Sequence, residues 1–98
     1  MINMYVAQNK DIAYRVIDEE AIILTPEDGM LHNLNALATR IFELANGART
    51  VNDIVKAVCD EFDVDENTAR RDTINFIEDL LHKKMLVLSN NPVKTSKR

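Results

Sequence analysis

The sequence predicts one small domain of the α+β class, because the spacing of its apolar residues changes along the chain. In the first third they alternate with a period of two, and after the stretch GMLHNLN, near Asn35, the period becomes about 3.6. The 98 residues include only two glycines and two prolines, and 46% are hydrophobic, which indicates a folded domain rather than a disordered chain. Together these observations predict a three-stranded antiparallel N-terminal sheet followed by three helices, an arrangement like that of a winged helix-turn-helix.

Three short strands account for the alternating part of the chain. They are predicted over residues 13–18, 20–25 and 29–34, with the DEE and TPEDG segments as the turns between them. Residues 1–12 alternate only weakly and are expected to form a flexible arm. Two alternatives stay open for this arm: it adds an edge strand to its own sheet, or it exchanges with a neighbouring copy.

Two helices are predicted from their start and stop signals. Asn35 is the expected N-cap of the first helix, and the Asn46 and Gly47 pair is the expected stop. Thr50 is expected to cap the second helix, supported by Asp53 at the third helical position, where its carboxylate can close a capping box. The caps therefore predict a short connection between the two helices.

The third helix, expected over residues 65–84, has a wider apolar face than one packing surface requires. At 100° per residue, one stripe must face the core and comprises Ala69, Thr73, Phe76 and Leu80. A second stripe lies about a quarter of a turn away and comprises Arg70, Ile74, Ile77 and Leu81. We predict that this second stripe lines a binding groove, with burial against the N-terminal arm or a second copy as the alternative.

The end of the chain completes the predicted organisation. The segment MLVLS favours a short terminal strand, and residues 89–98 are expected to be a flexible basic tail. The folded domain is predicted to span residues 13–88, since no repeat or second domain boundary is visible.

Charge and cysteine content narrow the function classes. Twelve Lys and Arg residues against sixteen Asp and Glu residues give 12 − 16 = −4, which does not favour nucleic acid or an anionic membrane. A winged-helix DNA-binding regulator remains the rival hypothesis, but the cations of the third helix are balanced by acidic residues. The single Cys59 cannot form an intrachain disulfide, and the sequence has no apolar run of membrane-spanning length, so a cytoplasmic location is expected.

No catalytic or metal-binding pattern is present. His32 and His82 are the only histidines, and neither has a partner at the spacing of metal ligands. The two glycines are explained by turns, and the acidic clusters lie in turns or at a helix start, where they complement the helix dipole. We therefore predict a protein that is not an enzyme and has no metal site and no cofactor.

The strand at residues 30–34 predicts peptide recognition. It contains no Pro or Lys to block its outer edge, so its unpaired amide and carbonyl groups form a template for another strand. An extended peptide can pair with this edge and insert side chains beside the second stripe of the third helix. The predicted contacts on the strand are Met30, Leu31, His32, Asn33 and Leu34. A homodimer formed through this edge is the alternative.

The segments LHNLNALATRIFEL, NGARTVNDIV and DVDENTARRDTINFIEDLL resemble the PqqD-like family, and the similarity extends over about residues 12–88. The resemblance implies a winged-helix-like recognition element for ribosomally made and modified peptides, which binds the leader of a precursor peptide and delivers it to a modifying enzyme, often a radical SAM protein. By position, it implies that the leader adds to Met30–Leu34 and lies along the stripe of Arg70, Ile74, Ile77 and Leu81. The chain departs from the commoner pattern at Leu31 or His32, where the family usually has an aromatic residue.

Overall fold

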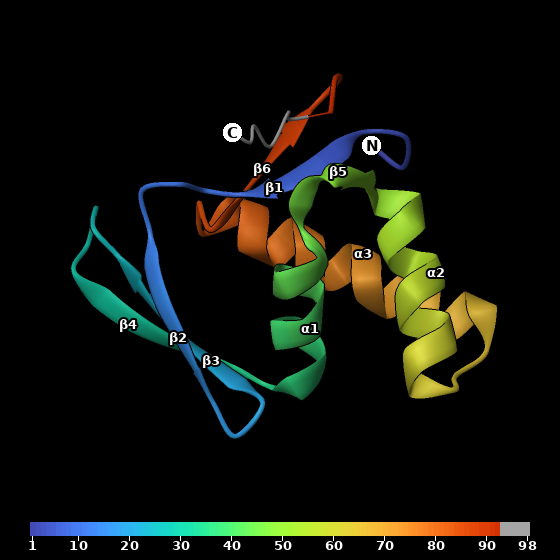
Figure 1. Cartoon of the computed structure of the whole chain (residues 1–98), viewed down its shortest axis with the longest axis horizontal. Coiled ribbons are helices and arrows are strands. Elements are labelled where there is room, and N and C mark those ends of the chain that lie inside the picture. Colours follow the sequence, from blue (N-terminus) through green and yellow to red (C-terminus); the bar gives the residue numbers. More distant parts are fainter. Residues whose placement is uncertain (93–98) are drawn as a thin grey trace, which may run out of the picture.

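The computed structural model describes residues 1–92, which form three helices and two antiparallel three-stranded sheets (Figure 1). The first sheet is the predicted meander, with the strand order β2-β3-β4. Its strands are β2 (Ala13–Ile17), β3 (Glu20–Thr25) and β4 (Met30–Leu34). The helices are α1 (Ala36–Leu44), α2 (Val51–Phe62) and α3 (Glu66–His82). The α+β class, with three sheet strands preceding three helices in a winged-helix-like arrangement, is therefore confirmed.

The predicted helix caps are present and explain where the helices begin. The side chain of Asn35 accepts a hydrogen bond of 2.8 Å from the amide of Ala38, so α1 starts directly after β4. At the start of α2, Thr50 and Asp53 accept hydrogen bonds from each other's amides, which closes the predicted capping box. Local side chains thus determine the strand-to-helix junction that follows the edge strand.

The second sheet corrects the prediction of a flexible N-terminal arm. It has the order β5-β1-β6, with β1 (Tyr5–Gln8) between β5 (Asn46–Thr50) and β6 (Leu86–Ser89). Val6 in β1 is completely buried. The terminal strand expected from MLVLS is β6, whereas β5 lies where only a connection between helices was expected. Strands of four or five residues have too weak a periodicity to predict, and their pairing joins segments far apart in the chain.

The folded unit consequently extends beyond the predicted span of residues 13–88 at both ends. It begins with β1 and includes Ser89, the last residue of β6. Residues 93–98, the greater part of the expected basic tail, lie outside the described residues.

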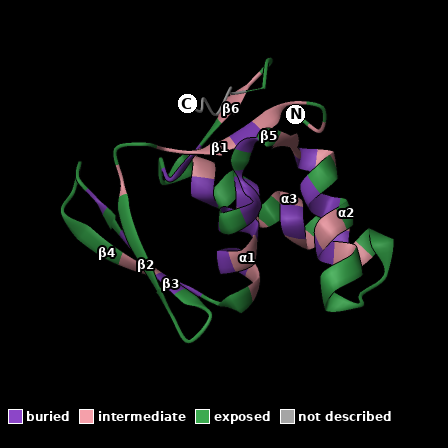
Figure 2. Ribbon diagram, in the orientation of Figure 1, coloured by how far each residue is buried: buried purple, intermediate pink, exposed green. Residues whose placement is uncertain are grey.

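One hydrophobic core lies where α1, α2 and α3 meet the inner faces of the two sheets (Figure 2). The Tyr14 ring on β2 packs edge-on against the Phe42 ring of α1, with 4.8 Å between the ring centroids. Every residue of β2 is nevertheless exposed, because α1 covers mainly the face of β3. The largest fully buried side chains include Phe42, Ile23, Ile41, Ile54, Ile77 and Leu80. The first sheet therefore keeps much of its surface open to solvent.

The buried face of α3 differs from the predicted one at two positions. Ala69, Thr73 and Leu80 are buried as predicted, but Phe76 is only half-buried, whereas Ile77 is completely buried. The buried arc is thus centred between the two predicted stripes, because α2, α1 and β6 all pack against this helix. Ile77 is a core residue and not part of a groove surface.

Candidate functional site

The open edge of β4 is the most clearly defined candidate site. β4 is the last strand of the first sheet, and among residues 1–92 it pairs only with β3. Thr39 of α1 joins the two strands: its hydroxyl accepts a hydrogen bond of 2.8 Å from the amide of Ala21 and donates one of 3.1 Å to the carbonyl of Leu34. The amide of Ala21 and the carbonyl of Leu34 therefore point toward each other across the pair.

The positions of these two groups show which main-chain amides and carbonyls of β4 remain free. In an antiparallel sheet the amide and carbonyl of one residue point to the same side, and successive residues alternate. Leu34, His32 and Met30 consequently direct these groups toward β3. The amides and carbonyls of Leu31 and Asn33 lie at the open edge, where they can pair with an added strand.

The side chains of β4 alternate between the two faces of the sheet. On the inner face, Leu34 is buried, His32 is half-buried and Met30 is 55% exposed. On the outer face, Leu31 is 68% exposed and Asn33 is exposed. An added strand would therefore meet apolar side chains on both faces of the sheet.

The turn at the start of β4 is held by polar contacts among four residues, which are Thr25, Asp28, Met30 and His32. The carboxylate of Asp28 accepts hydrogen bonds from the Thr25 hydroxyl and, at 3.0 Å, from the Met30 amide. These two bonds hold the pKa of Asp28 below its ordinary value of 3.8, and the bond from Thr25 has the larger effect. The Nε2 atom of His32 lies 3.3 Å from the same Thr25 hydroxyl. Gly29 has a φ of +67°, a conformation that favours glycine, and completes the turn.

The residues predicted on α3 do not all lie in one place. Ile74 and Leu81 are half-buried and pack against the core, but Ile77 is completely buried and cannot contact a peptide. Arg70 forms an ion pair with Glu66, at 3.5 Å, and lines a hollow between α2 and α3. It lies eleven residues before Leu81, about 16 Å along the helix axis. The structure therefore separates Arg70 from the C-terminal end of the stripe.

The C-terminal end of α3 lies beside the turn that leads into β4. The Nζ atom of Lys84 is 3.4 Å from the carboxylate of Glu27 in that turn. The side-chain amide of Asn9 donates a hydrogen bond of 2.8 Å to the carbonyl of Lys84. Leu81 is thus the residue of the predicted second stripe that lies closest in sequence to Lys84 and its contacts.

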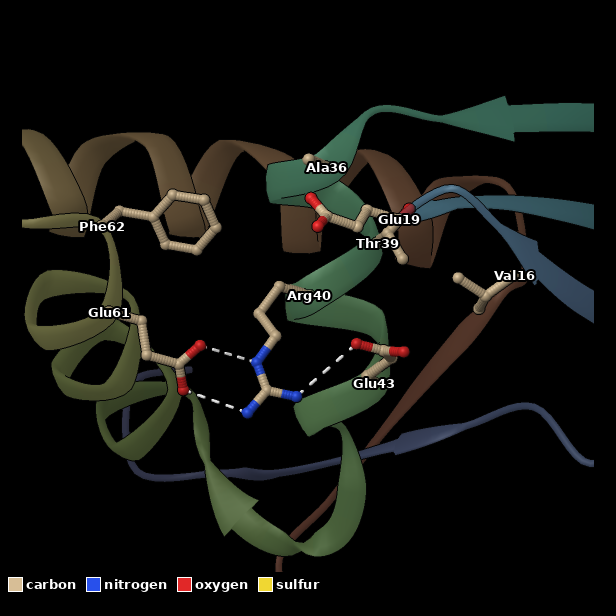
Figure 3. A pocket seen from close by; sticks show the side chains of 8 residues that line it. All are labelled: Val16, Glu19, Ala36, Thr39, Arg40, Glu43, Glu61 and Phe62. Atoms are coloured by element: carbon tan, nitrogen blue, oxygen red, sulfur yellow. Dashed lines mark hydrogen bonds and ion pairs between the residues drawn. The ribbon is translucent and has the colours of Figure 1, made fainter.

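A separate hollow of about 320 Å³ lies between α1, the end of α2 and the β2–β3 turn (Figure 3). Arg40 extends across it and forms two hydrogen bonds to the carboxylate of Glu61, at 2.7 and 3.0 Å, and an ion pair with Glu43 at 3.5 Å. The bonds between Arg40 and Glu61 lower the pKa of Glu61 and raise that of Arg40. The side chains lining this hollow include no histidine, serine or cysteine, and the hydroxyl of Thr39 is held between the Ala21 amide and the Leu34 carbonyl.

Thr39 is a site residue that the sequence reasoning missed. Its position on the otherwise apolar buried face of α1 was the available signal, because a buried hydroxyl needs hydrogen-bond partners. Within residues 1–92, no group of three or more His, Cys, Asp or Glu side chains is placed to hold a metal ion. In the same part of the chain, no helix has the length and apolar character needed to cross a membrane.

The fold and this edge define a class: a winged-helix-like domain with an unblocked sheet edge available to an added strand. Residues 20–86 match the model of the family described as coenzyme PQQ synthesis protein D (PqqD). The chain belongs to this family, as the resemblance in its sequence indicated. No match was found among curated protein sequences.

Three solved structures are similar to this chain. TbiB1 in complex with the TbiA(beta) leader peptide is 30% identical, covers 82% of this chain and 93% of its own, and has a TM-score of 0.74. Lasso peptide synthetase B1 complexed with its leader peptide is 20% identical, with coverages of 84% and 96% and a TM-score of 0.72. The solution structure of the PqqD truncation of Methylobacterium extorquens PqqCD, a stand-alone recognition element for ribosomally synthesised and modified peptides, is 20% identical, with coverages of 84% and 87% and a TM-score of 0.67. The two structures at 20% identity show that the fold is shared.

Proposed function

We propose that this chain binds the leader segment of a ribosomally made precursor peptide by strand addition to β4 and presents it to a modifying enzyme. The observation that carries the proposal is the open edge, where the amides and carbonyls of Leu31 and Asn33 face outward and no Pro or Lys blocks a partner strand. Support comes from TbiB1, which is 30% identical to this chain and was solved with a leader peptide bound.

The proposed contacts follow from the positions of the side chains. The peptide pairs with Met30–Leu34 through the main chain, and its side chains on the inner face lie toward the C-terminal half of α3. Ile74 and Leu81, both half-buried, are the proposed apolar contacts on that helix. Arg70 is proposed to contact a more distant part of the leader, and Ile77 supports the surface from within the core.

We propose that the chain acts without catalysis of its own, as a carrier for a tailoring enzyme of which a radical SAM protein is one class. The lining of the hollow in Figure 3 supports this, because Glu43 and Glu61 form ion pairs with Arg40 and the Thr39 hydroxyl is held by main-chain groups. A reducing cytoplasm is the proposed location, supported by the one free cysteine, Cys59.

Replacing Asn33 tests the strand addition. Asn33→Pro removes an outward-facing amide that β3 does not use, and proline is tolerated on an edge strand, so we expect the domain to stay folded. Binding of a fluorescent synthetic leader peptide should weaken at least tenfold relative to the wild type, as measured by anisotropy. Asn33→Ala, which keeps the amide, is the matched control and should bind within about twofold of the wild type.

Two outcomes would contradict the proposal. One is a folded Asn33→Pro variant that binds the leader as tightly as the wild type. The other is binding to duplex DNA with a steep loss of affinity in rising salt and no binding of the leader, which would favour the DNA-binding regulator instead. Peptide binding should depend weakly on salt because its main contacts are main-chain hydrogen bonds and apolar side chains.

A further inference from the structure

The face of the first sheet that points away from the helices has exposed aliphatic side chains. Leu31 is 68% exposed, Ile17 is 48% exposed and Leu24 is 39% exposed. Together with Ile22 and Arg15 they line a shallow open hollow on this face. Clusters of exposed apolar side chains with polar neighbours are often interaction surfaces.

The strand register arranges these side chains in rows across the sheet. Ala13 pairs with Leu24, and Leu24 pairs with Leu31, so one apolar row crosses all three strands and ends at the open edge. The next row on the same face runs from Arg15 through Ile22 and ends at Asn33. Directly paired residues lie about 4.5 to 5.5 Å apart on one face. A residue opposite Leu31 on an added strand therefore continues the apolar row.

We propose that the leader presents an aliphatic residue opposite Leu31, on the outer face of the sheet, and a polar residue opposite Asn33. This inference rests on the proposed function. The residue opposite Met30 faces inward, where Met30 is itself 55% exposed. The leader thus carries two adjacent apolar residues, one on the outer face of the sheet and one on the inner face. A strand that contacts only one face would instead carry apolar residues at every second position.

The size of the apolar row and the charge of the chain favour a short peptide over a second copy of this chain. The row ends beside the free amides and carbonyls of Leu31 and Asn33, so an occupant that covers Leu31 also lies along these groups as an extended segment. Three partly exposed aliphatic side chains amount to a few hundred Å² at most, against roughly 800 Å² per partner in a stable protein interface. Two copies would each have a net charge of −4 and would repel each other.

Selection of peptides tests the inference without knowledge of the natural leader. Random dodecapeptides displayed on phage are selected against the purified full chain and against Leu31→Asn. The wild type should enrich peptides with two adjacent apolar residues. A peptide enriched on the wild type should bind Leu31→Asn on the order of fivefold more weakly, the upper end for one cross-strand pair. Selection on Leu31→Asn should replace one of the two apolar residues by a polar one.

Ile17→Asn is the matched control, because Ile17 is exposed on the same face but lies on β2, at the opposite edge of the sheet from β4. It should bind the selected peptide within twofold of the wild type. If peptides are enriched but Leu31→Asn binds them as tightly as the wild type, or Ile17→Asn weakens binding equally, the outer-face inference is wrong while strand addition stands. If the folded wild type enriches no peptide, the proposed function fails, and this inference with it.

Discussion

The hydroxyl group of Thr39 links α1 to the sheet that carries the candidate binding edge. It joins the first residue pair of β3 and β4 by accepting from Ala21 and donating to Leu34. Because Thr39 is 2% exposed, water cannot easily replace it as a partner for these two groups. The residue therefore couples α1 to the strand register from which the free groups of Leu31 and Asn33 follow.

Thr39→Val keeps the shape of the side chain but leaves the Ala21 amide and the Leu34 carbonyl without a partner. Unpaired buried polar groups cost about 1 to 3 kcal/mol, so we expect the free energy of unfolding in urea to fall by about that amount. Thr39→Ser, which keeps the hydroxyl, is the control and should lose less. Equal losses for the two variants would show that the hydroxyl bridge is not what stabilises the junction.

At the scale of the element, α3 combines a buried side with a partly exposed one, and three surfaces pack against it. Its neighbours α1, α2 and β6 bury Ile77 completely and leave Ile74 and Leu81 half-buried. Of the predicted stripe, only Ile74 and Leu81 are therefore accessible enough to serve as the proposed apolar contacts on this helix.

Ile77→Ala should lower the free energy of unfolding by about 2 to 5 kcal/mol, the range for truncating a fully buried isoleucine. Ile74→Ala, on the half-buried side, should cost clearly less, and chemical denaturation of both variants provides the comparison. Ile77→Asp should unfold the domain because it buries a charge without a partner. A folded Ile77→Asp variant that has lost only peptide binding would restore Ile77 to the groove surface.

At the scale of the whole molecule, the two sheets have different roles. The first sheet leaves its β2 and β4 edges open, whereas the second connects the N-terminus, the link between α1 and α2, and the segment after α3. Among the described residues, β5 and β6 each pair with β1 and not with each other. Val6 of β1 also belongs to the core. The N-terminal segment is therefore part of the fold on which the open edge depends.

Deleting residues 1–8 should remove cooperative unfolding at 25 °C or lower the free energy of unfolding by several kcal/mol. The deletion takes Val6 from the core and exposes the main-chain groups of β5 and β6 that face β1. Circular dichroism during thermal unfolding measures the effect. A truncated chain that unfolds cooperatively with nearly unchanged stability would mean that residues 1–8 are, after all, a dispensable arm.

The elements that the sequence predicts correctly are those with local signals. The meander strands, the Asn35 cap between β4 and α1, and the Thr50 and Asp53 capping box depend on residues within a few positions of one another, and the structure contains all of them. The absence of Pro and Lys from β4 was equally readable. These features depend on alternation and on short-range hydrogen bonds, which a sequence displays directly.

Features that depend on contacts between distant parts of the chain are visible only in the folded structure. These are the pairing of the second sheet, the burial of Ile77 and the direction of the β4 edge. The second sheet pairs β1 with strands more than thirty-five residues away, and such short strands leave almost no periodic trace. Periodicity placed Ile77 on an apolar arc but could not show how much of the arc the neighbouring elements cover. The Thr39 hydroxyl likewise connects α1 with a main-chain group of β3 and one of β4. These contacts show which atoms of β4 face the open edge. Burial and edge direction are properties of packing, and packing is set by contacts between elements rather than by spacing within them.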